Sequence, residues 1–203
     1  MLKRFSTVVV VLTVVGIIFT GLSISGCQQQ SPKQVEAPKP QGSQKASSAK
    51  TETGPSMEVK EHIKQGLAYV STAKNARDKA LFEENMKNAN KEFSLAIEKD
   101  PNYADAYSNR AVAYMQEKKF NKAMEDLKKA KELNPDSASI RYNFACLYSL
   151  KNDVDLSLDE IDAALEKGFN DYESLRKDPD LNNVRKHPEF KQILEKHKVF
   201  IMK

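Results

Sequence analysis

The stretch Tyr103–Asp136, YADAYSNRAVAYMQEKKFNKAMEDLKKAKELNPD, decides the fold of this chain of 203 residues. Its apolar and small residues recur at helical spacing in two groups, which are Tyr107, Ala111 and Tyr114, then Phe120, Ala123, Leu127, Ala130 and Leu133. Asn134 and Pro135 end the second group, because proline cannot continue a helix. The stretch therefore predicts two amphipathic helices joined by a turn.

The same pattern returns 34 residues away on both sides of this stretch. The forward equivalents are Ala145, Tyr148, Val154, Ser157, Ile161 and Ala164, and the backward equivalents are Ala89, Phe93, Ala96 and Pro101. A repeated helix pair of this length, with small residues where helices approach closely, resembles the tetratricopeptide repeat (TPR) family. The resemblance implies an all-α fold, a right-handed α-solenoid of about three TPR helix-turn-helix repeats with a C-terminal helical cap.

The repeat pattern divides the chain after residue 56 into four parts. These are a first repeat at 57–103, a second at 104–137, a third at 138–171 and the cap at 172–203. In the first repeat, Gly66 takes the place of Ala111 only if 11 residues are inserted around Ser71–Leu81. Eleven residues make almost three helical turns, so we expect longer helices with an unrotated apolar face.

The end of the third repeat and the cap carry their own signals. Gly168 is expected to end a helix in the left-handed conformation. Pro179 and Pro188 each follow a possible N-cap residue and are expected at the first position of a helix. The phrases Asp178–Leu181 and Pro188–Phe190 resemble the segment that often closes TPR arrays, which predicts that the cap covers the last hydrophobic surface.

Residues 1–26 read as an export signal that precedes the fold. Lys3 and Arg4 come before an uncharged apolar run, and small residues follow. The residues 24–27, Ile-Ser-Gly-Cys, resemble the lipobox of bacterial lipoproteins, which implies cleavage before Cys27 and lipid on its thiol. An uncleaved transmembrane helix is the alternative, because Phe5–Ile24 is long enough to span a bilayer. Both interpretations predict that the rest of the chain is exported.

Residues 27–56 are predicted to be a lipidated N-terminus followed by a disordered linker. The segment is rich in Gln, Ser, Pro and Lys and has little apolar surface to bury. Gln28, rather than Asp, follows Cys27, which by resemblance to enterobacterial lipoproteins favours the outer membrane. The predicted location is therefore a lipid anchor in a bacterial membrane, on the periplasmic side of the outer membrane.

Charge and composition argue against several classes of function. Without Lys3 and Arg4, the chain has 30 of its 32 basic residues against 28 acidic ones, so it lacks the basic surplus of a nucleic-acid-binding protein. Lysines such as those at 128, 129 and 131 alternate with acidic residues at 125, 126 and 132, and we interpret them all as a solvated outer face.

No catalytic, cofactor or metal site is predicted. Phosphate-loop, dinucleotide-binding and nucleophile-elbow motifs do not occur, and no carboxylate lies at ligand spacing beside His62, His187 or His197. His197 lies between two lysines and is assigned to the solvated surface. Cys146 is interpreted as a small apolar filler, with an intermolecular disulfide as the alternative.

A solenoid offers a concave groove lined by the first helix of each repeat. The residues a quarter-turn from the packed positions are the predicted partner-binding residues, Asp105, Ser108, Asn109, Val112, Gln116, Ser139, Tyr142, Asn143 and Leu150. Their counterparts in the first repeat are Lys60, Ile63, Lys64, Leu67 and Ser71, and Cys146 is another in the third. This mixed lining suits an extended or helical peptide better than a phosphate or a metal.

The phrase Tyr107–Ala111 also resembles TPR domains that clamp the C-terminal carboxylate of a peptide. Of the residues of that clamp, only Asn109 can be carried over. Ser139 and Asn143 stand where the clamp has basic residues, and Ile63 and Leu67 stand where it has Lys and Asn. The sequence therefore argues against a carboxylate clamp.

The predicted function is a membrane-anchored TPR module that binds another protein, as an adaptor or assembly factor in the bacterial cell envelope. That role is an analogy with exported TPR lipoproteins, because a fold alone does not select a partner. The alternative is a self-associating structural lipoprotein whose groove binds its own chain. An enzyme is disfavoured, because no convergent set of polar residues is evident.

Overall fold

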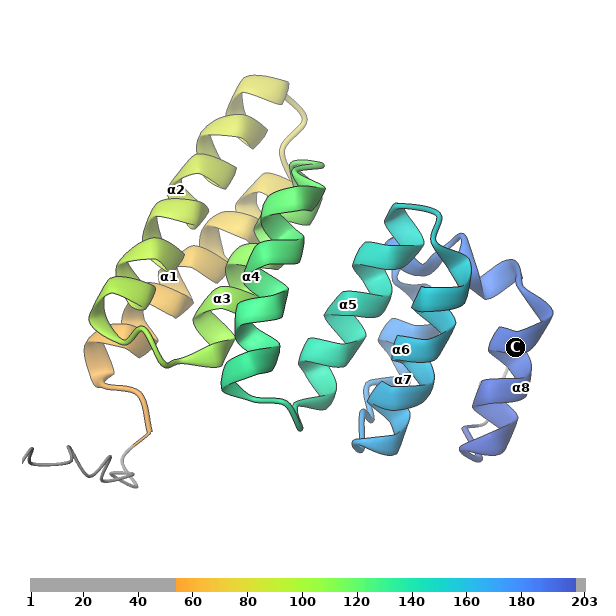
Figure 1. Cartoon of the computed structure of the whole chain (residues 1–203). Helices are drawn as coiled ribbons and strands as arrows, with labels where there is room; N and C mark the ends of the chain where they lie inside the picture. The colour runs from red at the N-terminus through yellow and green to blue at the C-terminus, as the bar shows by residue number, and fades with distance from the viewer. Residues whose placement is uncertain (1–53, 200–203) are drawn as a thin grey trace, which may run out of the picture. The chain divides into compact units, whose positions relative to one another are not determined.

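The computed structural model describes residues 54–199, which form helices and no strand, so the predicted all-α class is confirmed (Figure 1). The elements are α1 (Met57–Lys74), α2 (Lys79–Lys99), α3 (Ala104–Gln116), α4 (Phe120–Leu133), α5 (Ala138–Leu150), α6 (Val154–Glu166), α7 (Tyr172–Lys177), η1 (Pro179–Leu181), η2 (Val184–Lys186) and α8 (Pro188–Lys196). Cys27, the predicted signal and most of the predicted linker lie outside the described residues. No helix among residues 54–199 is long and apolar enough to cross a membrane.

The pairs α3–α4 and α5–α6 pack closely because small residues lie where the helices meet (Figure 1). Ala111, Ala123 and Ala130 are fully buried, as the repeat pattern predicts. In the next pair Ser157 replaces Ala123, and its hydroxyl donates to the carbonyl of Ala145 at 2.7 Å. The polar group is therefore satisfied, and the close approach is kept.

The first pair is longer than the other two, as the inserted residues predict. Helices α1 and α2 have 18 and 21 residues, against 13 and 14 in α3 and α4. Gly66 lies where α1 crosses α2, and a Cβ atom there would come within 2.4 Å of the Phe93 ring. Glycine is therefore needed at this position because Phe93 fills the space of its side chain.

Most of the helices end next to a proline or to a residue with positive φ. Helices α2 and α4 stop directly before Asp100-Pro101 and Asn134-Pro135. Gly168 has a φ of 89°, and the amide of Phe169 donates to the carbonyl of Ala164 at 2.9 Å, which confirms the predicted left-handed helix end. Lys118, Asn152 and Lys198 adopt positive φ at the ends of α3, α5 and α8.

The largest group of buried apolar residues, here called the main core, is contiguous from α3 to the C-terminal segment. Two smaller groups lie between the first pair and α3. Tyr107, Tyr114 and Tyr148, which recur at equivalent positions of the repeat, pack against the main core but are only half-buried. Leu181 and Val184 of the C-terminal segment are fully buried in it.

Arg110 and Asp126 form an ion pair that the sequence did not predict. Arg110 Nε donates to Asp126 Oδ2 at 2.7 Å and Nη2 to Oδ1 at 2.8 Å, while Nη1 donates to the Ser94 hydroxyl at 3.0 Å. The assignment of Asp126 to a solvated outer face is wrong, because this carboxylate is buried between helices. The pair links α2, α3 and α4.

Candidate functional site

A hollow of about 360 Å³ lies on the side formed by the first helix of each pair. It is lined by the end of α1, by α3 and α5, and by the turn that begins η1. The lining residues are Lys74, Val112, Met115, Gln116, Tyr142, Asn143, Cys146, Asp178, Pro179 and Asp180. The hollow is therefore a part of the predicted groove that can hold a ligand group.

The structure brings four of the nine predicted groove residues together in this hollow: Val112, Gln116, Tyr142 and Asn143. The other five lie elsewhere, since Asp105 and Ser139 are exposed, Asn109 is half-buried, Ser108 is buried, and Leu150 packs against the main core. Ser108 accepts a hydrogen bond from Asn143 Nδ2 at 2.9 Å, so it orients a lining residue.

The C-terminal cap forms one wall of the hollow, which the sequence did not predict. The Tyr142 hydroxyl donates to Asp178 Oδ2 at 2.8 Å, and Gln116 Nε2 donates to Asp180 Oδ2 at 3.3 Å. Asn183 Nδ2 donates to the carbonyl of Ser149 at 2.8 Å. The cap thus lies along α5 as well as against α6.

A capping hydrogen bond, a proline and a buried leucine fix the cap wall of the hollow in place. Asp178 Oδ1 accepts a hydrogen bond from the Asp180 amide at 3.0 Å, and Pro179 occupies the first position of η1, as predicted. Leu181, on the same turn, is fully buried and fixes the turn to the main core. The sequence signal was the Asp-Pro-Asp-Leu phrase, but only the tertiary contact with α5 shows that it faces the groove.

Burial changes the ionisation of several groups around the hollow. The pKa of Asp180 is raised by desolvation and by the neighbouring Asp178 charge, while Lys74 and the Gln116 hydrogen bond act in the opposite direction. Burial also raises the pKa of the Tyr142 hydroxyl and of the Cys146 thiol. Cys146 is 3% exposed, so its thiol stays protonated and the packing interpretation is favoured over a disulfide between chains.

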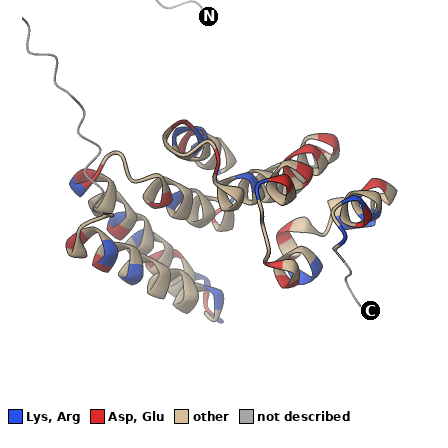
Figure 2. Cartoon of the chain, turned by 90° about the horizontal axis from the view of Figure 1, so that it is seen from below, with Lys and Arg blue, Asp and Glu red and all other residues tan. Residues whose placement is uncertain are grey.

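Basic and acidic residues are interspersed on most of the described helices (Figure 2). Helix α6 differs, because it carries five acidic residues and no basic one, but Glu160, Asp162 and Glu166 pair with basic side chains of other helices. Several form exposed pairs, such as Lys129 with Glu132 at 3.3 Å and Lys167 with Asp136 at 2.5 Å. Such pairs contribute little to stability in water. Charge on these surfaces therefore does not single out a second binding site.

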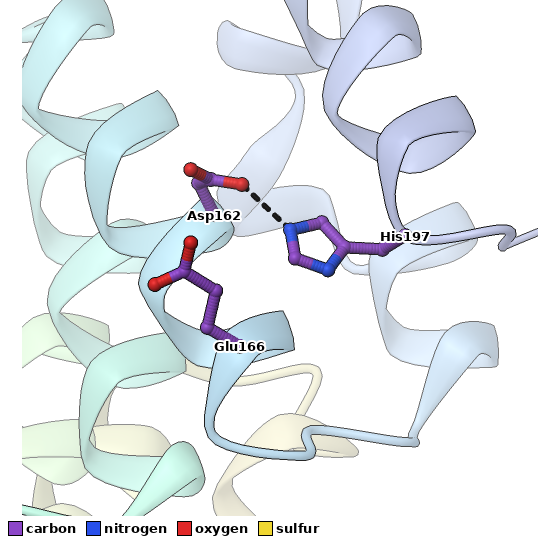
Figure 3. Close-up of side chains that lie close together, drawn as sticks. All are labelled: Asp162, Glu166 and His197. Atoms are coloured by element: carbon purple, nitrogen blue, oxygen red, sulfur yellow. Dashed lines mark hydrogen bonds and ion pairs between the residues drawn. The ribbon is translucent and has the colours of Figure 1, made fainter.

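The assignment of His197 to the solvated surface is wrong. Its side chain is 16% exposed, and Nε2 lies 2.6 Å from Asp162 Oδ1 on α6 (Figure 3). Glu166 lies one turn further along α6, and the ligand atoms of the three residues are all within 4.8 Å of one another. Histidine and carboxylates at such distances could hold a metal ion.

Lys196 occupies the position of a cation in this group. Its Nζ lies 2.8 and 2.7 Å from the two oxygens of Asp162 and 3.3 Å from Glu166 Oε1. An ion would have to displace this ammonium group from both carboxylates. We therefore interpret the four residues as an ionic contact that holds α8 to α6. His62 similarly contacts Glu92 at 2.7 Å between α1 and α2.

Comparisons with known proteins identify the repeat. Residues 104–137, which the sequence assigned to the second repeat, match the family model described as Tetratricopeptide repeat. A segment of 62 residues is 40% identical to a chloroplastic protein from Arabidopsis thaliana, and covers 30% of this chain and 18% of that protein.

A solved TPR protein structure shares the fold. A thermophilic TPR protein from Thermus thermophilus aligns with a TM-score of 0.55 and 26% identity over 61% of this chain and 63% of that one. The TPR2B domain of yeast Sti1, in its pHsp70 complex, aligns with a TM-score of 0.48 and 25% identity over 70% of this chain and 98% of that one. The chain thus spans less than two thirds of the Arabidopsis and Thermus relatives, and residues 54–199 have a TPR-like solenoid fold.

Proposed function

We propose that this TPR-like solenoid binds an extended segment of a partner protein in the groove along α1, α3 and α5. The observation that carries the proposal is the hollow, which combines apolar and polar side chains at the place where the repeat fold presents its concave face. A pocket with mostly apolar walls and a few oriented polar groups is the usual form of a binding site.

Amide side chains support a peptide as the ligand. Asn109, Gln116 and Asn143 lie on α3 and α5, and each amide offers both a hydrogen-bond donor and an acceptor. A peptide unit offers the same two groups in the complementary arrangement. Val112 and Met115, also on α3, supply apolar contact beside them.

Helix α1 supports a binding surface that extends beyond the hollow. Leu67, which aligns with Val112, is 48% exposed, and the exposed Lys60 and Lys64 precede it on the same face. Burying a leucine side chain contributes about 1.5 to 3 kcal/mol when it is complete. A partner that covers Leu67 gains part of this free energy.

Catalysis is not part of the proposal, because Asp178, Tyr142 and Cys146 beside the hollow are engaged in folding contacts. Asp178 caps η1 and accepts a hydrogen bond from the Tyr142 hydroxyl, and burial keeps the Cys146 thiol protonated. These contacts stabilise the wall of the groove instead of activating a nucleophile.

The finer proposal is that lipid on Cys27 anchors this module to a bacterial membrane, where it acts as an adaptor or assembly factor of the cell envelope. The apolar run after Lys3 and Arg4 and the residues 24–27 support it. Acyl chains contribute about 0.8 kcal/mol per buried methylene, so two or three chains hold a soluble domain at a bilayer. Periplasmic exposure at the outer membrane is part of this proposal.

Self-association is the second candidate, because a segment of the same chain already lies along α5 in the groove. The contacts of Asp178 with Tyr142 and of Asn183 with Ser149 hold the 3-10 turn η1 of the cap against this surface. A second copy of the chain could supply a similar segment to the part of the groove left open.

Site-specific photocrosslinking in cells tests these candidates. A photoreactive residue replaces Asn109 or Gln116 in the groove, and Lys128 on the exposed face of α4 is the matched control. We expect the same partner protein to be captured from both groove positions and not from the control. Adducts with only a second copy would support self-association, and the same adducts from all three positions would contradict binding in the groove.

Cell fractionation tests the anchor separately. Cys27→Ser should release the protein from the membrane while the far-ultraviolet circular dichroism and melting temperature of its helices stay unchanged. Retention of this variant at the membrane would support the uncleaved helix. Separation of inner and outer membranes on a density gradient then tests the outer-membrane proposal.

A further inference from the structure

Asp180 is a carboxylate in the hollow with a single weak side-chain hydrogen bond. Its Oδ2 accepts one long hydrogen bond, 3.3 Å from Gln116, and within residues 54–199 its Oδ1 accepts none. The neighbouring Asp178 differs, because the Asp180 amide and the Tyr142 hydroxyl occupy its two oxygens at 3.0 and 2.8 Å. Asp180 is thus free to accept hydrogen bonds from a ligand.

The surroundings of Asp180 make an unpaired carboxylate costly. The side chain is half-buried, and desolvation together with the Asp178 charge raises its pKa. A partly desolvated carboxylate is stabilised most by a cation that also donates hydrogen bonds. Positions of this kind, in a cleft and with a perturbed pKa, are frequent at functional sites.

The hollow has the size and lining for a long basic side chain. Its volume of about 360 Å³ is roughly ten times the share of one water molecule in the liquid. Val112, Met115 and Pro179 line it and can contact the methylene groups of Lys or Arg, whose stems pack on apolar surface. Of the charged residues in its lining, two are aspartates and one is Lys74.

We propose that this hollow binds a Lys or Arg side chain of the partner segment, with the methylene stem on Val112, Met115 and Pro179 and the cationic group on Asp180. The inference rests on the proposed function, since the side chain belongs to the segment bound in the groove. It adds a specificity that the TPR-like fold does not supply, because Asp180 comes from the cap and not from a repeat helix.

Lys74 tunes this specificity. It is exposed at the last turn of the elongated α1 and lines the hollow together with the cap residues. Its charge acts on Asp180, which makes it the intramolecular competitor of an incoming cation. Removing this charge should strengthen the preference for a basic side chain, whereas removing the charge of Asp180 should abolish it.

Selection from a displayed library of random 12-residue peptides tests the inference on the full chain in detergent micelles. We expect the enriched sequences to share a Lys or Arg at one position. Labelled synthetic copies of the enriched peptides then provide dissociation constants by fluorescence anisotropy. The Asp180→Asn variant should bind them about tenfold or more weakly and lose the preference between Arg and its uncharged replacement Gln.

Three variants complete the experiment. Asp159→Asn removes an exposed carboxylate from α6, outside the hollow, and should leave binding unchanged. Lys74→Ala should increase the ratio of affinities for the Arg and Gln peptides, and Asp180→Lys should select acidic peptides. Unchanged melting temperatures would show that the variants are folded.

The outcomes separate this inference from the proposed function. Enriched peptides that share no basic residue, or that bind Asp180→Asn as well as the original chain, would overturn the cationic site and leave peptide binding intact. Failure of the library to yield any shared sequence that competes at the groove would overturn peptide binding itself, and the inference with it.

Discussion

The first helix pair and the last differ in how they are held. Helices α1 and α2 are the longest, yet their buried residues belong to two small groups, and Leu67 and Leu81 stay exposed. Helices α5 and α6 are shorter but belong to the main core, with the cap on one side and α4 on the other. We therefore expect the stability of each pair to follow its packing and not its length, because tertiary packing stabilises a helix more than its own hydrogen bonds do.

This difference predicts where the solenoid opens first. In a solenoid each pair contacts only its neighbours, so an end pair without a cap loses structure at a lower free energy than an interior pair. The α1–α2 pair carries the groove residues Leu67 and Lys74. We expect the N-terminal wall of the groove to adapt to a partner, whereas the α5–cap wall stays rigid.

Large-to-small substitutions in the two cores should have the largest effects. Ile161 in the main core and Met86 in the first pair are both fully buried. Each replacement by Ala should lower the free energy of unfolding by about 2 to 5 kcal/mol. Hydrogen exchange should then show faster exchange across α3–α8 in Ile161→Ala, but mainly across α1–α2 in Met86→Ala. If amide exchange in α5 and α6 became faster by the same factor in both variants, the proposed division into separate cores would be contradicted.

The Arg110–Asp126 pair lies in the middle helix pair and also contacts Ser94 of α2, and its loss should have the next largest effect. The side chains are 19% and 10% exposed, so Asp126→Ala leaves a largely desolvated guanidinium group without its carboxylate. We expect a loss of about 2 to 3 kcal/mol by urea denaturation, below the range for a fully buried pair. The double variant Arg110→Met, Asp126→Ala should recover part of that loss, because it also removes the uncompensated charge. A double variant that is less stable than Asp126→Ala would contradict this explanation.

Gly66→Ala tests the close approach inside the first pair. The new methyl group would meet Phe93, so overpacking should lower the free energy of unfolding by about 1 to 3 kcal/mol. The higher helix propensity of Ala over Gly offsets roughly 1 kcal/mol of this loss. A smaller Phe93→Leu side chain should make the same Gly66→Ala change neutral or stabilising. Melting temperatures of the four proteins measure this coupling, and additive effects would contradict the contact.

The smallest predicted effect is a loosening of α8 at low pH. Burial raises the pKa of Asp162, but hydrogen bonds from Lys196 and His197 outweigh it and lower the pKa below its ordinary value of 3.8. A lowered pKa contributes stability that is complete above the ordinary value and is lost as the pH falls through the folded-state value. NMR signals of α8 should therefore shift below about pH 3.8, before those of α5.

Two substitutions check the acid effect. Asp162→Asn should remove most of the pH dependence of α8. Asp136→Asn removes a different carboxylate, one whose pKa is lowered by its contact with Lys167, and should leave α8 unchanged. Retention of the acid transition in Asp162→Asn would show that another group controls it.

The sequence by itself determined the helices and their pairing. Small residues at a period of 34, the prolines after Asp100 and Asn134, and Gly168 act through local sterics and hydrogen bonding, which depend on near neighbours in the chain. The length of α1 and α2 followed from the 11 inserted residues for the same reason.

Only the tertiary structure decided which side chains meet. Asp178 and Asp180 reach the groove because Leu181 and Val184 bury the cap against residues far away in the sequence, and the same docking brings His197 to Asp162. The pairing of Arg110 with Asp126 likewise depends on the crossing of two helices. Periodicity assigns each residue to one face of its helix. Which residues meet between helices depends on how whole helices pack, and the proposed specificity of the groove arises from those contacts.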